Sequence, residues 1–169
     1  MSRAIVPVMK GESQHELIQL VSFNLGSEDY AVEVLKVREI IRMTSITHIP
    51  NTPPSIEGII NLRGKVIPVV DLRLKFRMPP AEYTQRTCII VVDVAGDGNR
   101  MLMGIVVDAV SEVSNIQPGD IETTPDFGEG VAIPYLLGIA KCKGKVKILL
   151  DIDKVLTTNE LTGLDKLMG

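Results

Sequence analysis

The sequence has few of the residues on which metal centres, redox sites and base-stacking surfaces depend. Its 169 residues include two cysteines, two histidines and no tryptophan, and only 4 % are aromatic. Cys88 and Cys142 each lack a second cysteine or histidine nearby, which excludes a zinc ribbon and a CxxC redox centre. The net charge of −3 gives no broad basic surface for nucleic acid. No apolar run reaches the roughly 18 residues of a membrane-spanning helix, so we expect no membrane insertion.

Catalytic motifs are also absent. The sequence contains no Gly-x-Ser-x-Gly, phosphate-binding loop, His-Glu-x-x-His or kinase signature. His15 and His48 have no plausible nucleophile with an orienting acid beside them. The segment 96–98 (Gly-Asp-Gly) resembles part of a calcium loop but lacks the downstream glutamate, and a hairpin turn is the simpler interpretation. We therefore predict no catalytic residue, no metal site and no cofactor.

Short apolar segments separated by turns dominate what is present. The hydrophobic fraction is 45 %, and valine and isoleucine are the most frequent apolar residues, a composition that favours strands. Residues 21–25 and 30–34 flank a Gly-Ser-Glu-Asp turn, and residues 87–94 and 101–107 flank a second turn, so each pair predicts a hairpin. The pattern predicts a mainly β barrel or sandwich rather than a doubly wound parallel sheet.

Three local features are less clear. Residues 35–41 have an apolar spacing that fits two turns of helix as well as a strand. Ser55 predicts a short capped helix through Ile60. Pro68 lies inside an otherwise strand-like run and predicts an edge strand or a bulge.

The chain also contains an internal repeat. Residues 58–66 (GIINLRGKV) align without gaps to residues 138–146 (GIAKCKGKV), and an aspartate follows each at Asp71 and Asp151. Residues 31–40 and 104–113 share a Val-x-x-Val-x-Glu pattern. Because the segments match in the same order, we predict two related small barrels. Chance similarity between hairpins is the alternative.

Two features indicate recognition. Arg63 follows a strand at a turn, where its guanidinium could pair with Glu39, bind an acidic group on a partner or remain solvated. Val37 and Val110 occupy equivalent places in the repeat. They belong either to the core or to an apolar patch where the lobes meet, and such a patch would form a protein-binding groove.

Several of these segments together resemble the CheW family of bacterial chemotaxis coupling proteins. The matching motifs are LKVREI, NTP, GIINLRG, IPVVDLR, GIVVDAVSEV and YLLG, and the resemblance covers roughly residues 16–156. It implies two five-stranded SH3-like β-barrel lobes around a shared hydrophobic core, with short helices and no catalysis. It also implies two partners, the regulatory domain of a CheA-type histidine kinase and the cytoplasmic tip of a methyl-accepting chemoreceptor.

The resemblance also implies site residues. Val37, Gly58 and Val110 correspond to receptor-groove positions, and Glu39 and Arg63 correspond to the family's charged pair beside that groove.

A kinase contact is implied at Asp126 and Phe127, although the following residues 128–130 match no fixed pattern. For the domain organisation we expect a leader over residues 1–15, a CheW-like domain over residues 16–157 and a short helix or tail over residues 158–169. Within the domain we expect one lobe from about residues 16–64 plus 146–157 and the other from about residues 65–145.

The sequence therefore predicts a non-enzymatic cytoplasmic adaptor, recruited to membrane-associated receptor arrays, that couples chemoreceptors to a histidine kinase. A CheW-like scaffold serving a pathway other than chemotaxis is the first alternative. A small-molecule-binding or hydrolytic β-barrel that uses the strand-end aspartates is the second.

Overall fold

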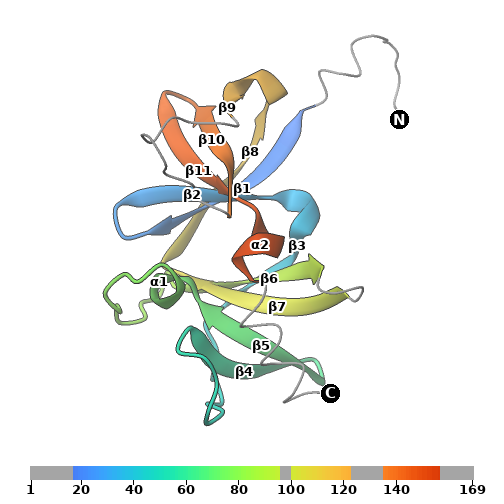
Figure 1. Ribbon diagram of the computed structural model, residues 1–169, viewed down its shortest axis with the longest axis vertical. Coiled ribbons are helices and arrows are strands. Elements are labelled where there is room, and N and C mark those ends of the chain that lie inside the picture. Colours follow the sequence, from blue (N-terminus) through green and yellow to red (C-terminus); the bar gives the residue numbers. More distant parts are fainter. Residues whose placement is uncertain (1–16, 96–99, 123–134, 157–169) are drawn as a thin grey trace.

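Two β-sheets build the protein. The computed structural model describes residues 17–95, 100–122 and 135–156. The six-stranded sheet has the order β8-β1-β2-β11-β10-β9 and forms the upper lobe in Figure 1. Its strands are β1 (Ile18–Leu25), β2 (Glu28–Glu33), β8 (Ala109–Ile116), β9 (Ile121–Glu122), β10 (Leu136–Cys142) and β11 (Lys145–Leu150).

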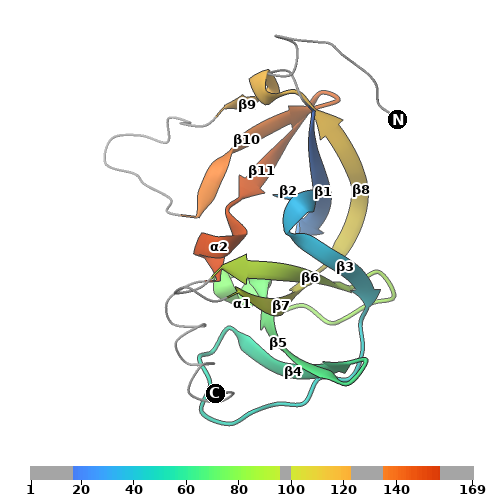
Figure 2. The same ribbon diagram turned by 90° about the vertical axis from the view of Figure 1, so that its right-hand side faces the viewer.

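The five-stranded sheet has the order β3-β6-β7-β5-β4 and forms the lower lobe (Figures 1 and 2). Its strands are β3 (Val37–Arg42), β4 (Ile56–Leu62), β5 (Lys65–Asp71), β6 (Cys88–Ala95) and β7 (Arg100–Val107). The helices among the described residues are single turns, namely η2 (Val34–Lys36), α1 (Leu72–Lys75), η3 (Pro118–Asp120) and α2 (Ile152–Val155). The predicted mainly β, two-lobed class is confirmed.

The lobes share one core, as predicted. The largest buried cluster contains Phe23 and Leu150 of the upper sheet together with Ile90, Val92 and Leu72 of the lower lobe. Each lobe also has its own smaller cluster. The α2 turn lies between the two sheets in both side views (Figures 1 and 2). Burial across the junction therefore joins the lobes into one hydrophobic unit.

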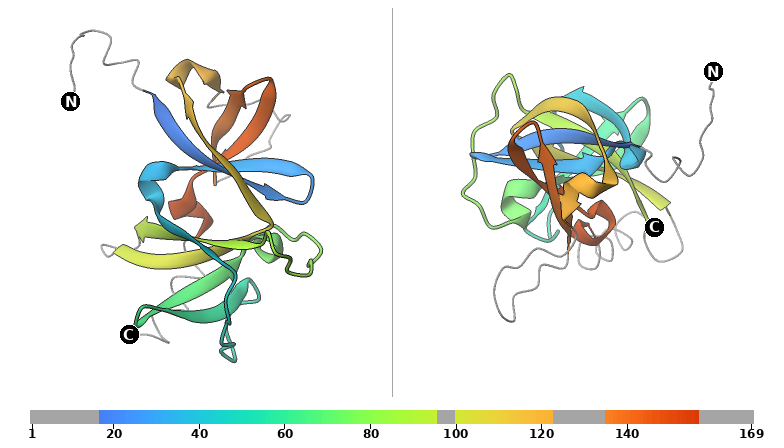
Figure 3. Two further views of the ribbon diagram at one scale, coloured as in Figure 1. Left: turned by 180° about the vertical axis from the view of Figure 1, so that it is seen from behind. Right: turned by 90° about the horizontal axis from the view of Figure 1, so that it is seen from above.

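The predicted assignment of residues to lobes was wrong. The chain builds β1 and β2 in the upper lobe, crosses at η2 to build β3–β7 in the lower lobe, and returns at Asp108 to build β8–β11. Figure 3 shows the strands that follow these crossings, β3 in the lower lobe and β8 in the upper lobe. The predicted boundary near residues 64 and 145 would divide the β4–β5 and β10–β11 hairpins, each of which is one antiparallel ladder. Such hairpins pair locally and stay in one sheet.

The internal repeat is real and is interleaved between the lobes. The parallel pairings β5–β7 and β11–β2 occupy the same register, with Val69 opposite Gly104 and Leu149 opposite Ala31. Asp71 and Asp151 each accept a backbone hydrogen bond at the start of the following short helix. Each lobe thus combines the first two strands of one repeat with the remaining strands of the other.

The strand count departs slightly from five per lobe. The upper lobe gains a sixth strand because β9 pairs with β10 at Ile139 and Ala140. The lower lobe has an isolated bridge between Thr47 and Ile59 at the equivalent place. The same contact is therefore a two-residue strand in one lobe and a single bridge in the other.

The three less clear segments are resolved as follows. Residues 34–36 form the η2 turn and residues 37–42 form a strand, so both readings of this segment apply in part. The helix predicted after Ser55 is wrong, because Ile56–Leu62 is a strand paired along its length with β5. Strand β5 is internal rather than an edge strand, but its pairing with β7 begins at Val69, so the missing N–H of Pro68 falls outside that ladder.

Candidate partner-binding site

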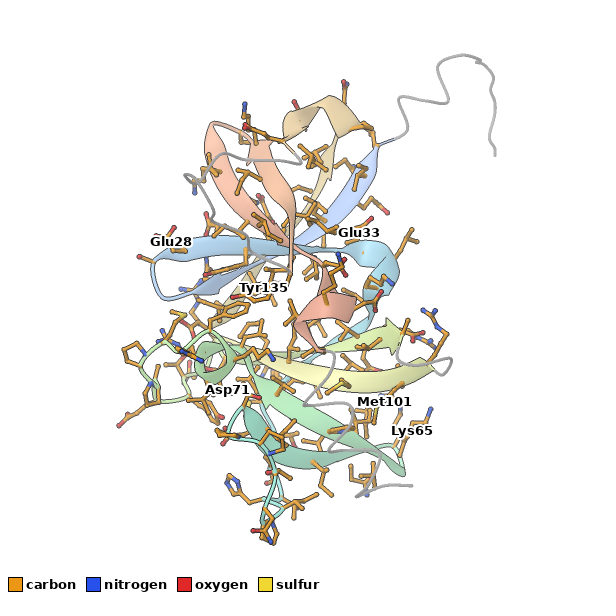
Figure 4. The ribbon with its side chains drawn as sticks, viewed as in Figure 1. Glu28, Glu33, Lys65, Asp71, Met101 and Tyr135 are labelled. Carbon is orange, nitrogen blue, oxygen red and sulfur yellow. The ribbon has the colours of Figure 1, made fainter. Side chains whose placement is uncertain are left out.

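Glu39 and Arg63 form an exposed ion pair on the lower lobe. Glu39 lies on β3, and Arg63 lies in the β4–β5 turn next to Lys65, which Figure 4 labels. Arg63 donates from Nη2 to Glu39 Oε1 and from Nη1 to Glu39 Oε2, the second over 3.3 Å. These hydrogen bonds raise the pKa of the guanidinium, whose side chain remains 71 % exposed. The pair is bidentate, which fixes the direction of the guanidinium while leaving it open to a partner.

The turn itself is fixed by local geometry. Arg63 has φ of 53°, and the N–H of Gly64 donates to Asn61 Oδ1 over 2.8 Å. Asn61 thereby closes the hairpin tip that carries Arg63. One of the roles that the sequence left open for Arg63, pairing with Glu39, is therefore what the structure shows.

Gly58 lies where another segment crosses its strand. Its φ is +153°, and an added Cβ would overlap the carbonyl oxygen of Thr47 and lie 2.8 Å from the Ile46 methyl. Gly138 meets the carbonyl of Glu122 in the same way in the upper lobe. Gly58 is buried, so the structure gives it a packing role below the surface rather than an exposed face.

Val37 and Val110 lie at the two crossings between lobes. Val37 is the first residue of β3 and pairs with Val92, whereas Val110 on β8 pairs with Phe23. Both are half-buried and pack against the shared core. They therefore belong partly to the core and partly to the surface at the lobe junction.

A third apolar residue at this junction had no clear sequence signal. Leu35 on η2 is 91 % exposed, the highest value among the large hydrophobic residues that the structure describes. The apolar spacing of residues 35–41 did not distinguish helix from strand, so the direction of this side chain could not be predicted. Exposed Leu35 and half-buried Val37 together give the junction an aliphatic edge.

Two ionic contacts hold the two crossings between the lobes. On one side Arg73 of α1 donates to Asp108 from Nε over 2.8 Å and from Nη2 over 2.6 Å, and Asp108 also accepts from the N–H of Gly26 over 2.7 Å. Hydrogen bonding to Arg73 lowers the pKa of the Asp108 carboxyl. We call this contact the Arg73–Asp108 clamp.

On the other side Lys36 of η2 donates to Asp153 of α2 over 2.7 Å, and Asp153 also accepts from the N–H of Ala95 over 2.9 Å. Both contacts place a helix residue against a crossing segment, with the charges reversed between them. The two contacts therefore hold in place the chain crossings next to Val37 and Val110.

The strand-end aspartates are all engaged structurally. Asp71 and Asp151 cap the short helices, Asp93 pairs with Arg38 and Arg100, and Asp108 and Asp153 hold the crossings. Within the described ranges, no group of three or more histidine, cysteine, aspartate or glutamate side chains could hold a metal ion. No helix among the described residues is long and apolar enough to span a membrane. Asp126, Phe127 and the predicted terminal segments 1–15 and 158–169 lie outside the described residues.

The fold is a β-protein built from two interleaved repeats. Its candidate site consists of an exposed ion pair and nearby aliphatic side chains on the surface. Residues 19–160 match the CheW-like domain model. The chain is 37 % identical over 162 residues to chemotaxis protein CheW of Klebsiella aerogenes, covering 96 % of this chain and 94 % of that protein. It is 31 % identical over 138 residues to Protein FrzA of Myxococcus xanthus, covering 80 % of this chain and 83 % of that protein.

A solved structure agrees with these sequence matches. The crystal structure of the scaffolding protein TtCheW from Thermoanaerobacter tengcongensis superposes with a TM-score of 0.73 at 36 % identity, covering 86 % of this chain and 95 % of that chain. The protein therefore belongs to the CheW-like domain family, and the resemblance seen in the sequence is confirmed.

Proposed function

We propose that the protein is a non-enzymatic adaptor that couples chemoreceptors to a CheA-type histidine kinase in a cytoplasmic signalling array. The observation that carries this proposal is the exposed, bidentate Glu39–Arg63 pair on a lobe whose junction presents aliphatic side chains. Membership of the CheW-like family supports it, and so do the names of two relatives, a chemotaxis protein and a scaffolding protein.

The receptor would bind at the lobe junction. A helix of the receptor tip would pack against Leu35, Val37 and Val110, and Arg63 would set its register through a charge contact. Gly58 would act indirectly, by keeping the segment at Thr47 close to β4. An exchangeable array component fits an interface near the low end of about 1,200–2,000 Å².

The kinase would bind elsewhere on the same module, through its own CheW-like regulatory domain. Asp126 and Phe127 remain the candidate contacts for that domain, on the basis of the family resemblance. With separate receptor and kinase surfaces, the protein would pass a conformational change from the receptor to the kinase. No covalent bond would be made or broken in it.

A reconstitution assay tests the receptor site. Receptor-containing membranes, purified kinase and the purified adaptor are combined, and receptor-dependent kinase autophosphorylation is measured. Arg63→Ala should reduce activation and weaken receptor binding about tenfold, since truncating an interface anchor costs about 1–2 kcal/mol. The matched control is Arg100→Ala, which removes another exposed arginine from an ion pair. Full activation by a folded Arg63→Ala protein, checked by circular dichroism, would remove Arg63 from the site.

The family resemblance leaves a second function for test, a CheW-like scaffold for a chemosensory pathway with another output. The two functions differ in partner and not in chemistry. Parallel reconstitutions with a chemotaxis kinase and with the kinase encoded beside this gene separate them, because only the true partner should be activated at sub-stoichiometric adaptor concentrations.

A further inference from the structure

The tip of the β10–β11 hairpin is the repeat counterpart of the turn that carries Arg63, and it has a different charge. Lys141, Lys143 and Lys145 are exposed around this turn, at the end of the upper lobe far from the lower lobe (Figures 1 and 3). The corresponding positions in the lower lobe are Asn61, Arg63 and Lys65. We call the three lysines together with Val113 and Val146 the upper tip.

A buried lysine adds to the charge difference. Lys147 is 3 % exposed, and its Nζ lies 2.8 Å from Glu112 Oε2 and 2.6 Å from Ser22 Oγ. In the lower lobe, Ile67 occupies the position equivalent to Lys147, and Val91 occupies the position equivalent to Ser22. Both are buried and apolar. The upper lobe therefore holds an ammonium group in its interior, and Glu112 is the carboxylate that compensates it.

Glu112 consequently serves two lysines. Its other oxygen, Oε1, lies 3.6 Å from Lys143 Nζ. Hydrogen bonding to Lys147 is the main reason that its pKa falls to about 2. In the lower lobe, by contrast, the charge of Glu39 is matched one to one by Arg63. The upper tip therefore carries excess positive charge, although the whole chain has a net charge of −3.

Aliphatic surface accompanies this charge. Val113 is 58 % exposed and Val146 is 59 % exposed, and Val146 lies directly opposite Lys141 in the hairpin. A shallow hollow of about 400 Å³ separates β8 from the hairpin. Its lining includes Val113, Lys141 and Lys143, and it also includes the carboxylate of Asp120, which accepts from the backbone of Gln117.

We propose that the upper tip is a second docking surface, which binds an acidic, aliphatic segment of a partner protein. Carboxylates of that segment would meet Lys141, Lys143 and Lys145, and its aliphatic side chains would cover Val113 and Val146. Three exposed lysines are fewer than the roughly four to eight that anionic lipid surfaces attract, and the upper tip has no aromatic side chain for stacking on nucleic-acid bases. The surface lies on the lobe opposite the Glu39–Arg63 pair, so it is separate from the proposed receptor site.

Fluorescence anisotropy with a defined peptide tests this surface. The probe is a fluorescein-labelled peptide of glutamate and leucine residues, and its comparison peptide has glutamine in place of glutamate. We expect the full chain to bind the glutamate peptide more tightly and to lose that preference at high salt. Lys141→Glu combined with Lys145→Glu should weaken binding about tenfold, while leaving Lys143, Lys147 and Glu112 in place.

A charge-matched control makes the test specific. Arg42→Glu combined with Lys65→Glu changes the net charge equally, at exposed positions on the lower lobe. This control should bind within about twofold of the unaltered chain. Val113→Ser with Val146→Ser should weaken binding about threefold to tenfold through lost aliphatic contact. Equal weakening by both charge variants, equal affinity for the two peptides, or binding only to phosphatidylserine vesicles would each overturn the proposal.

Discussion

Replacing Gly58 by alanine separates a packing role from a contact role at the candidate site. A Cβ at this position would overlap the carbonyl of Thr47. That carbonyl and the N–H of the same residue make two hydrogen bonds with Ile59, each 2.9 Å long. Displacing both bonds costs about 1–3 kcal/mol, and holding alanine at a φ of +153° adds about 1–3 kcal/mol. We therefore expect Gly58→Ala to lower the free energy of unfolding by about 2–6 kcal/mol.

Urea denaturation followed by far-ultraviolet circular dichroism measures this loss, since the chain has no tryptophan for fluorescence. Two matched variants calibrate it. Gly138→Ala makes the equivalent clash with Glu122 without a positive φ, and so should lose less stability. Gly119→Ala has open space around its Cβ and should change stability by less than about 1 kcal/mol. If Gly58→Ala unfolds at the same urea concentration as the unaltered chain but no longer binds receptor, Gly58 is a contact residue and the packing argument fails.

Three further predictions concern charged and phenolic side chains. Asp108→Asn should lower the free energy of unfolding by about 1–2 kcal/mol at pH 7, measured by urea denaturation. Because the Asp108 pKa is lowered on folding, that difference should be present above the carboxyl's ordinary pKa and vanish as pH falls through its lowered value. Glu112→Ala should destabilise the protein by leaving buried Lys147 without its carboxylate, and it should do so more than Lys147→Met, which should cost less than about 1 kcal/mol. The reverse order in urea denaturation would contradict this account. Desolvation and the neighbouring Glu57 raise the Tyr83 pKa to about 12, so Tyr83→Phe should remove the corresponding step from an absorbance titration at alkaline pH.

The local features of the fold could be predicted from the sequence, because short-range patterns determine them. The hairpins at residues 21–34 and 87–107 follow from alternation and turn residues, and the repeat follows from aligned glycines and aspartates. The Glu39–Arg63 pair was one of the roles that the turn position of Arg63 left open, and the family resemblance also implied it. The helix expected after Ser55 failed because pairing with β5 outweighed the capping preference of one serine.

Long-range pairing could not be predicted in the same way. The contact between Lys36 and Asp153 joins residues 117 positions apart, and no periodicity indicates it. The assignment of hairpins to lobes depends on the short parallel pairings β5–β7 and β11–β2, which involve three and two residue pairs. Such brief ladders leave little trace in the sequence, so the interleaving of the repeats became visible only in the structure.

Interleaving also places Val37 and Val110, two residues of the proposed receptor site, at the lobe junction. A simple tandem duplication would join its two halves by one connection, whereas here the chain crosses between lobes at η2 and again at Asp108. Val37 and Val110 follow these two crossings, so a helix bound across both would contact each repeat at once. The Arg73–Asp108 clamp and the Lys36–Asp153 pair hold the same crossings from opposite sides. A partner that shifted one crossing would therefore act on the relative position of the lobes, and with it on any surface carried by the far end of the upper lobe.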